Sequence, residues 1–187
     1  FTDEYYMAPT FNTPKNTDLL FVSRLAEVKN IPLFIEALKI YEEKYKRKLK
    51  VNMLLGASAD NTSEQGKKIL NDIKEKFGDI KNYVNLIENA DYKEMSKYYS
   101  GAKFTVLTSL IEGKNRTIQE SMSCNTPVIV FRDHNKWARG PHEIIYEKAG
   151  LYVPEFSSKS LAATIYKGLN DYGMFKQEGN ILNTTAE

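Results

Sequence analysis

The chain has 187 residues, of which 42% are hydrophobic and 27% are charged, and its formal net charge is +2. This length suits one full hydrophobic core, the composition is neither that of a disordered chain nor that of a membrane protein, and the small charge gives no electrostatic case for nucleic acid. The single Cys124 excludes an internal disulfide and fits a reducing compartment, and no Cys/His cluster has zinc spacing.

Short apolar runs alternate with helical periodicity along the chain. Residues 1–16 contain two prolines among polar and aromatic residues and are predicted to be an interdomain connector. Apolar runs bounded by turn residues predict strands at 18–23, 51–56, 83–87, 104–107, 127–131 and, at an edge, 150–153. Apolar residues recurring every three or four positions predict helices at 32–48, 63–77, 91–100, 117–124 and 157–169, with one or two further turns at 142–148.

This alternation predicts βαβ units and a parallel sheet. We therefore expect an α/β, Rossmann-like doubly wound domain over residues 17–172, with a mostly parallel sheet, helices on both faces, and a polar tail over 173–187. Ligands of such domains bind outside the carboxyl ends of the strands. The loops of interest are therefore those that follow strands, at 23–30, 56–62, 88–91, 108–117 and 132–142.

The first of these loops carries two cations, Arg24 and Lys29. Lys29 lies just before a predicted helix N-terminus, where the helix dipole disfavours a positive charge. An anion bound between Lys29, Arg24 and the helix would remove that conflict. The alternative is two solvated surface cations, one of them paired with Glu27. Gly56 in the second loop either approaches a ligand closely or forms a plain turn.

The stretch from Thr108 to Pro127 carries two acids, Glu112 and Glu120, around a loop and a predicted helix start. If residues 112–120 were all helical, the carboxylates would lie ~12 Å apart along the axis and ~80° apart around it, too far to share a proton. They could hold two parts of an extended ligand whose phosphates lie at the helix N-terminus. Alternatively, residues 117–120 form a capping box in which Glu120 serves the helix end, and Glu112 is an ordinary loop acid.

Four signatures follow one another in a fixed order. They are Arg24 with Lys29, then Ser109-x-x-Glu112-Gly113, then Glu120, then Asn125-Thr126-Pro127-Val128. Together they resemble the C-terminal half of family 4 glycosyltransferases of the GT-B fold, and the resemblance runs from about residue 18 to about residue 169. It is the combination that is specific, because a pair of glutamates at this spacing is common.

The resemblance implies a nucleotide-diphosphate-sugar donor of the UDP, GDP or ADP type and retaining transfer to a glycan or lipid-linked acceptor, as in polysaccharide biosynthesis, with no metal and no cofactor. Arg24 and Lys29 would neutralise the diphosphate, and Glu112 would hold the sugar hydroxyls. Glu120 would accept hydrogen bonds from the ribose. The implied catalytic set is Glu112, Arg24 and Lys29, and the substrate-binding set is Glu120, Gly113, Lys114, Asn115, Arg116, Thr117 and Gly56.

The sequence departs from the family pattern in three places. Ser23 and Asn30 stand where glycine is usual, so the first loop is expected to turn less tightly. Residues 114–116 replace an aromatic-Gly-aliphatic run with Lys-Asn-Arg, which puts polar groups beside the donor sugar. Residues 132–140 are longer and more charged than the usual Gly-rich segment, and either shape the donor or acceptor side or form a surface loop.

A GT-B enzyme has its active site between two Rossmann-like domains. The chain begins at Phe1 without Met, and we expect it to be part of a longer protein whose N-terminal domain is missing, so that it binds a donor without useful turnover. The whole protein is expected in the cytoplasm, with peripheral association at the inner face of the membrane as a further option, and without nucleic acid. Two alternatives remain: a GT-B nucleotide-sugar epimerase, which would need acids and a histidine across the cleft, and a non-catalytic nucleotide-binding regulatory module.

Overall fold

The computed structural model describes residues 13–56, 63–112, 115–131 and 149–175, and these form one parallel six-stranded sheet in the order β3-β2-β1-β4-β5-β6. The strands are β1 (Thr17–Ser23), β2 (Val51–Leu55), β3 (Val84–Glu88), β4 (Ala102–Val106), β5 (Val128–Phe131) and β6 (Gly150–Val153). The α-helices are α2 (Ile31–Tyr45), α4 (Glu64–Phe77), α5 (Met95–Gly101), α6 (Arg116–Ser123) and α7 (Ser158–Asn170). The predicted α/β, doubly wound architecture is confirmed.

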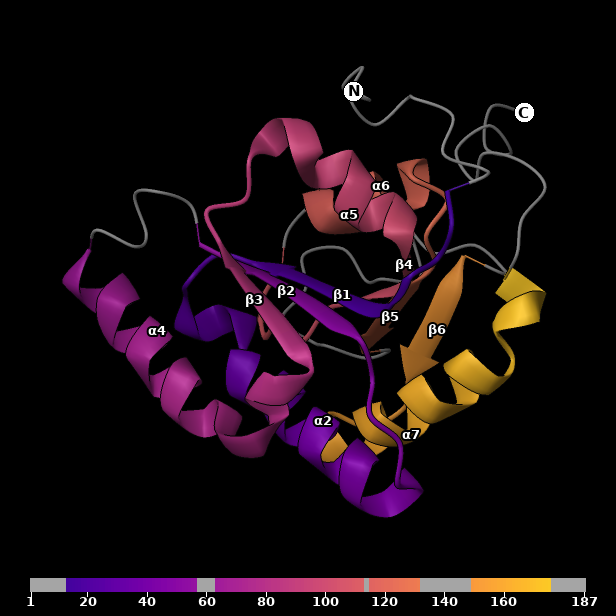
Figure 1. The fold of residues 1–187 in the computed structure, drawn as a ribbon, viewed down its shortest axis with the longest axis horizontal. Coiled ribbons are helices and arrows are strands. Elements are labelled where there is room, and N and C mark those ends of the chain that lie inside the picture. Colours follow the sequence, from indigo (N-terminus) through magenta and orange to yellow (C-terminus); the bar gives the residue numbers. More distant parts are fainter. Residues whose placement is uncertain (1–12, 57–62, 113–114, 132–148, 176–187) are drawn as a thin grey trace.

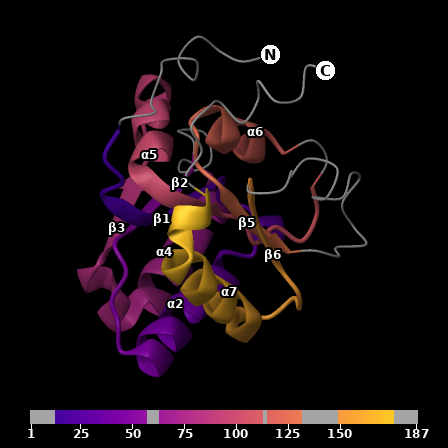
Figure 2. The same ribbon diagram turned by 90° about the vertical axis from the view of Figure 1, so that its right-hand side faces the viewer.

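Helices cover both faces of the sheet. Figure 1 shows α5 and α6 on its upper side and α2, α4 and α7 on its lower side, and Figure 2 shows the same layers from a second direction. The strand order reverses between β1 and β4, and the helices that follow these two strands, α2 and α6, lie on opposite faces. The loops after β1 and β4 therefore lie at the point where the strand order reverses, at the carboxyl end of the sheet, which is the usual ligand site of this fold.

The alternation of side chains along each strand builds one core on each face. In β1, Leu19 and Phe21 pack into the core beneath α2, α4 and α7, whereas Leu20 packs into the core beneath α5. Leu19 and Leu20 are both 0% exposed, so the strand is buried on both sides. Such burial explains why the strands read in the sequence as continuous apolar runs.

Element bounds differ from the prediction by a few residues, and two differences bear on the reading of the sequence. The fourth strand begins at Ala102, two residues before the predicted start. The prediction began later because Lys103 interrupts the apolar run. Lys103 nevertheless lies within the strand, where its Nζ is 2.7 Å from Asp18 Oδ1 on the adjacent β1. The predicted helix over 91–100 is a 3₁₀ turn, η3 (Tyr92–Glu94), followed by α5. The segments at 132–142 and 142–148 and the loop 57–62 lie outside the described residues.

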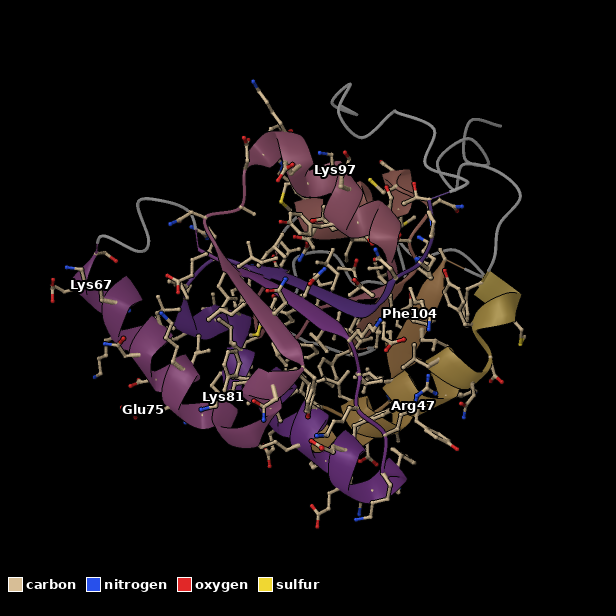
Figure 3. The ribbon with its side chains drawn as sticks, viewed as in Figure 1. Arg47, Lys67, Glu75, Lys81, Lys97 and Phe104 are labelled. Atoms are coloured by element: carbon tan, nitrogen blue, oxygen red, sulfur yellow. The ribbon has the colours of Figure 1, made fainter. Side chains whose placement is uncertain are left out.

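The C-terminal end of the described chain folds back onto the sheet. A 3₁₀ turn, η5 (Tyr172–Phe175), follows α7, and the rings of Tyr172 and Phe175 pack edge-on against Phe104 of β4 at centroid distances of 5.5 and 5.3 Å. Figure 3 shows Phe104 inside the molecule, while the labelled Lys67 and Lys97 lie on its outer surface. Ordered packing therefore continues past residue 172, the boundary where the polar tail was predicted to start.

Candidate functional site

A cavity of about 750 Å³ opens at the carboxyl ends of β1, β2 and β3, beside the N-terminal end of α6. Its volume lies within the range typical of small-molecule sites. Its lining residues come from four separate chain segments: Val22, Ser23, Arg24, Lys29, Leu54, Gly56, Asn89, Ala90, Tyr92, Met95, Glu112, Asn115, Arg116, Thr117 and Glu120. The prediction that a ligand site lies at the strand ends therefore coincides with a real cavity.

The loops after β1 and β4 are fastened together beside the cavity. The Thr108 hydroxyl donates to the carbonyl oxygens of Lys29 and Asn30, at 2.8 and 3.1 Å. The backbone N–H of Leu110 donates to the carbonyl oxygen of Val28 at 2.7 Å. Thr108 is 1% exposed, so its bonds form away from water. These bonds fix the position of one loop relative to the other.

This fastening brings Lys29 and Glu112 into contact. The Lys29 ammonium donates to Oε1 of Glu112 in an ion pair, and the two side chains are 18% and 10% exposed. Lys29 ends a 3₁₀ turn, η1 (Glu27–Lys29), and Asn30 then takes a left-handed conformation (φ 47°) before α2 begins. The alternative partner considered for the loop cations, Glu27, is not the partner of Lys29, and neither Lys29 nor Glu112 is a fully solvated surface charge.

The α6 helix begins one residue earlier than predicted, and its N-cap lies two residues before Thr117. Its N-cap is Asn115, whose Oδ1 accepts from the Ile118 N–H at 3.3 Å, and Arg116 is the first helical residue. The capping box proposed for residues 117–120 is therefore wrong. Asn and Thr are both favoured at the N-cap, and in this helix Asn115, not Thr117, occupies that position. The first-turn N–H groups of α6 lie at the wall of the cavity, where a helix favours an anion.

Glu120 is held by a buried tyrosine instead of by the helix end. The Tyr99 hydroxyl of α5 donates to Oε2 of Glu120 at 2.9 Å, and Arg116 Nη2 lies 3.6 Å from Oε1. The Arg116 side chain is 76% exposed, so its contribution to holding the carboxylate is small. Glu112 and Glu120 thus have different partners, Lys29 for the first and Tyr99 for the second.

Buried hydroxyls fix α6 on the sheet. The Ser121 Oγ lies 2.7 Å from Thr105 Oγ1 of β4 and 2.8 Å from the carbonyl oxygen of Thr126. Thr126 in turn donates from its hydroxyl to the carbonyl oxygen of Tyr99 at 2.6 Å. Ser121, Thr105 and Thr126 are each 0% exposed. The helix that carries Glu120 is therefore fixed to both β4 and α5.

The structure gathers most of the residues predicted from the sequence. Both loop cations, both glutamates and the glycine after β2 line the cavity, as do residues 115–117. Gly56 has a φ of 79° and donates its N–H to the Ser23 carbonyl oxygen at 2.9 Å, so it forms a turn at the cavity wall. Gly113 and Lys114 lie outside the described residues, as does the charged loop 132–140.

Sequence reasoning pointed to the loop 88–91 after β3 but named no site residue in it. Asn89, Ala90, Tyr92 and Met95 line the cavity there, and Tyr99 supports Glu120 from behind. A signal existed for the first of these, because residues 88–91 follow a strand and Asn tolerates the left-handed conformation that Asn89 adopts, with φ 56°. Tyr99 carried no such signal, because helical periodicity marks it only as a core residue.

The other end of α6 contacts the segment that precedes β1. Lys15 donates from Nζ to the carbonyl oxygen of Asn125 at 3.3 Å and to Thr126 Oγ1 at 2.8 Å. Burial lowers the pKa of Lys15 to about 8, partly opposed by the nearby Cys124. Burial also raises the pKa of the Cys124 thiol to about 12. Cys124 is therefore a protonated core residue.

Within residues 13–56, 63–112, 115–131 and 149–175, His, Cys, Asp and Glu side chains form no cluster of three or more that could hold a metal ion. Among the helices in the same ranges, none is both long and apolar enough to cross a membrane.

Comparison with known proteins connects this geometry to a family. The family model described as "Glycosyl transferases group 1" matches residues 5–181. None of the curated proteins matches the chain. The fold is similar to that of a TarM mutant from S. aureus in complex with fondaparinux, α-GlcNAc-glycerol and UDP, with a TM-score of 0.67 and 19% identity, over 92% of this chain and 32% of that one.

Two further structures have the same fold. HepE from Anabaena, in complex with UDP, gives a TM-score of 0.69 at 17% identity, over 97% of this chain and 48% of that one. The C-terminal domain of a group 1 family glycosyl transferase, LpcC from Francisella tularensis, gives a TM-score of 0.67 at 21% identity, over 93% of this chain and 88% of that one. The chain therefore spans a third to a half of the length of the first two proteins and nearly all of an isolated C-terminal domain.

Proposed function

We propose that this chain, which belongs to the family of group 1 glycosyl transferases, is the donor-binding C-terminal domain of a retaining, metal-independent family 4 enzyme. The observation that supports this proposal is the convergence of two cations, two carboxylates and a helix N-terminus on one cavity. Cations and helix N-termini suit a diphosphate, and carboxylates suit the hydroxyl groups of sugars. A nucleotide-diphosphate sugar contains both a diphosphate and sugar hydroxyl groups.

The diphosphate is proposed to lie between Lys29, Arg24 and the start of α6. Lys29 is already paired with Glu112, but an ammonium has three N–H donors and can also donate to phosphate oxygens. A lysine and an arginine together with helix N–H groups would stabilise the negative charge that develops on the departing diphosphate. In this proposal these groups take the place of a divalent metal ion.

The two glutamates are proposed to hold the two ends of the donor. Glu112, beside Lys29, would accept hydrogen bonds from hydroxyls of the transferred sugar, and Glu120, farther along α6, would accept them from the ribose. The base would then lie against the residues that follow β3, among them Asn89 and Tyr92. TarM and HepE were each determined with UDP, which makes UDP the first nucleotide to test, with GDP and ADP beside it.

The whole protein is proposed to transfer this sugar to a glycan or a lipid-linked acceptor in polysaccharide biosynthesis. In this proposal a second, N-terminal Rossmann-like domain supplies the acceptor side of the cleft, and this chain binds the donor without useful turnover. The shares of TarM and HepE that the chain covers, 32% and 48%, support a two-domain whole. The proposed location is the cytoplasm, with peripheral association at the inner face of the membrane as a further option.

Isothermal titration calorimetry with UDP, GDP and ADP tests the proposal on this chain. We expect at least one of the three to bind, with chemical-shift changes in an NMR titration centred on residues 24–29 and 112–120. No calorimetric or chemical-shift response to any of the three at millimolar concentration would overturn it. In the full-length protein, Glu112→Ala and Lys29→Ala should abolish transfer, whereas unchanged transfer would indicate a regulatory nucleotide-binding module.

A further inference from the structure

We propose that Tyr99 is a positioning residue for nucleotide recognition, because its buried hydroxyl holds the Glu120 carboxylate in the orientation that receives the ribose. This inference rests on the proposed function, since it concerns the same cavity. It adds a residue that does not line the cavity and that the sequence marks only as core. The argument depends on how rigidly Tyr99 is held and on which oxygen of Glu120 it contacts.

Tyr99 is fixed at both its backbone and its ring. It lies on α5 and is 0% exposed, and its ring packs with Leu20, Leu54 and Met95 beneath that helix. Its carbonyl oxygen accepts the Thr126 hydroxyl at 2.6 Å. A side chain held in this way loses little further freedom when its hydroxyl forms a hydrogen bond, so the position of the hydroxyl is set before any ligand arrives.

The Tyr99 hydroxyl contacts one carboxylate oxygen of Glu120. Tyr99 donates to Oε2 at 2.9 Å, while Oε1 lies 3.6 Å from the exposed Arg116. The Glu120 side chain is 18% exposed and lines the cavity. A carboxylate has about four lone-pair sites, so the phenol can occupy one of them and leave acceptor capacity for a ligand.

A fixed carboxylate matters because the ribose contact is directional. The two hydroxyls of a ribose are adjacent, and a carboxylate receives both only in a narrow range of orientations. A glutamate free to change rotamer would have to be ordered on binding, and that ordering would reduce affinity. The Tyr99 hydrogen bond, formed from a buried tyrosine to a mostly buried carboxylate, removes this cost before the nucleotide binds.

The test compares UDP with 2′,3′-dideoxyuridine diphosphate, which lacks both ribose hydroxyls, in wild type and in Tyr99→Phe. Tyr99→Phe removes one hydroxyl and keeps the buried ring. We expect calorimetry to show UDP affinity lowered by about 3- to 10-fold and the affinity for the dideoxy analogue unchanged. With Glu120→Ala as background, the same substitution should have no further effect on UDP, because the carboxylate that the hydroxyl orients has been removed.

Tyr98→Phe is the matched control, because Tyr98 is the neighbouring, partly buried tyrosine of α5. It should leave the affinities for both nucleotides at the wild-type values. An equal loss for UDP and the dideoxy analogue in Tyr99→Phe would show a structural role only and overturn the inference, as would unchanged UDP affinity. If wild type binds neither UDP, GDP nor ADP, the proposed function fails and this inference fails with it.

Discussion

Lys29 and Glu112 form an ion pair although 83 positions separate them in the sequence. The pair exists because β1 and β4 are neighbours in the sheet and the loops that follow them are joined by backbone and hydroxyl hydrogen bonds. One member is proposed to contact the diphosphate and the other the sugar. On this proposal the pair would lie at the junction of the two parts of the donor.

Lys29→Met should weaken the binding of UDP and leave that of uridine unchanged. A charge-assisted hydrogen bond contributes roughly 1.5–3 kcal/mol, so we expect the UDP dissociation constant to rise by about 10-fold or more. Part of the loss would come from the Glu112 carboxylate, which would then face the phosphates without its cation. Adding Glu112→Gln should recover that part.

Calorimetry with both ligands measures these effects. Lys67→Met is the matched control, because Lys67 forms an ion pair with Glu64 on the outer side of α4. Figure 3 shows Lys67 on the outer surface. Removing the Lys67 charge should change the affinity for neither UDP nor uridine. A similar loss for uridine and UDP in Lys29→Met would place Lys29 in a structural role and contradict the prediction.

Asn115→Ala should destabilise the protein and also weaken UDP binding. Loss of an N-cap hydrogen bond costs about 1 kcal/mol, and here it loosens the end of α6 that faces the cavity. Ser157→Ala removes the equivalent cap of α7, where the Ser157 hydroxyl accepts from the Ser160 N–H at 3.1 Å, away from the cavity. Urea unfolding should give similar stability losses for the two variants, and calorimetry should show weaker UDP binding only for Asn115→Ala.

These two caps and the ion pair show what the sequence could and could not predict. The sheet, its flanking helices and the loops with Arg24, Lys29, Glu112 and Glu120 follow from periodicity and from the rule that ligands lie at strand ends. The start of α6 could not be settled, because Asn115 and Thr117 have similar capping preferences. The ion pair and the Tyr99 hydrogen bond depend on distances between segments that periodicity does not give.

Gly150→Ala should strongly destabilise the sheet edge. A Cβ at Gly150 would lie 2.2 Å from the carbonyl oxygen of Val128, its register partner on β5, and backbone cannot move aside cheaply. We expect a loss of about 2 kcal/mol or more in the free energy of unfolding. Gly173→Ala is the control, because a Cβ there meets nothing within 4 Å. Equal thermal midpoints for the two variants would contradict this reading of the β5–β6 contact.

The stability that Lys15 contributes should depend on pH. Burial lowers its pKa from 10.5 to about 8 in the folded chain, so between these values the unfolded chain binds the extra proton and stability rises with pH. Lys15→Met removes this titration. The difference in unfolding free energy between wild type and Lys15→Met should therefore shift in favour of wild type from pH 8 to pH 10. Urea titrations at several pH values measure it, and a difference constant with pH would contradict the assignment.

The hydrogen bonds from Thr108 and Leu110 to the preceding loop also have a dynamic consequence. Because they join the segments after β1 and β4 into one mechanical unit, neither segment can be displaced without the other. A sugar that engages only Glu112 would thus restrain Arg24 and Lys29 as well, and the Leu110 amide would exchange with solvent only when the whole unit opens. A contact at one end of the proposed donor would in this way restrict the motion of the residues at its other end without any change in the sheet.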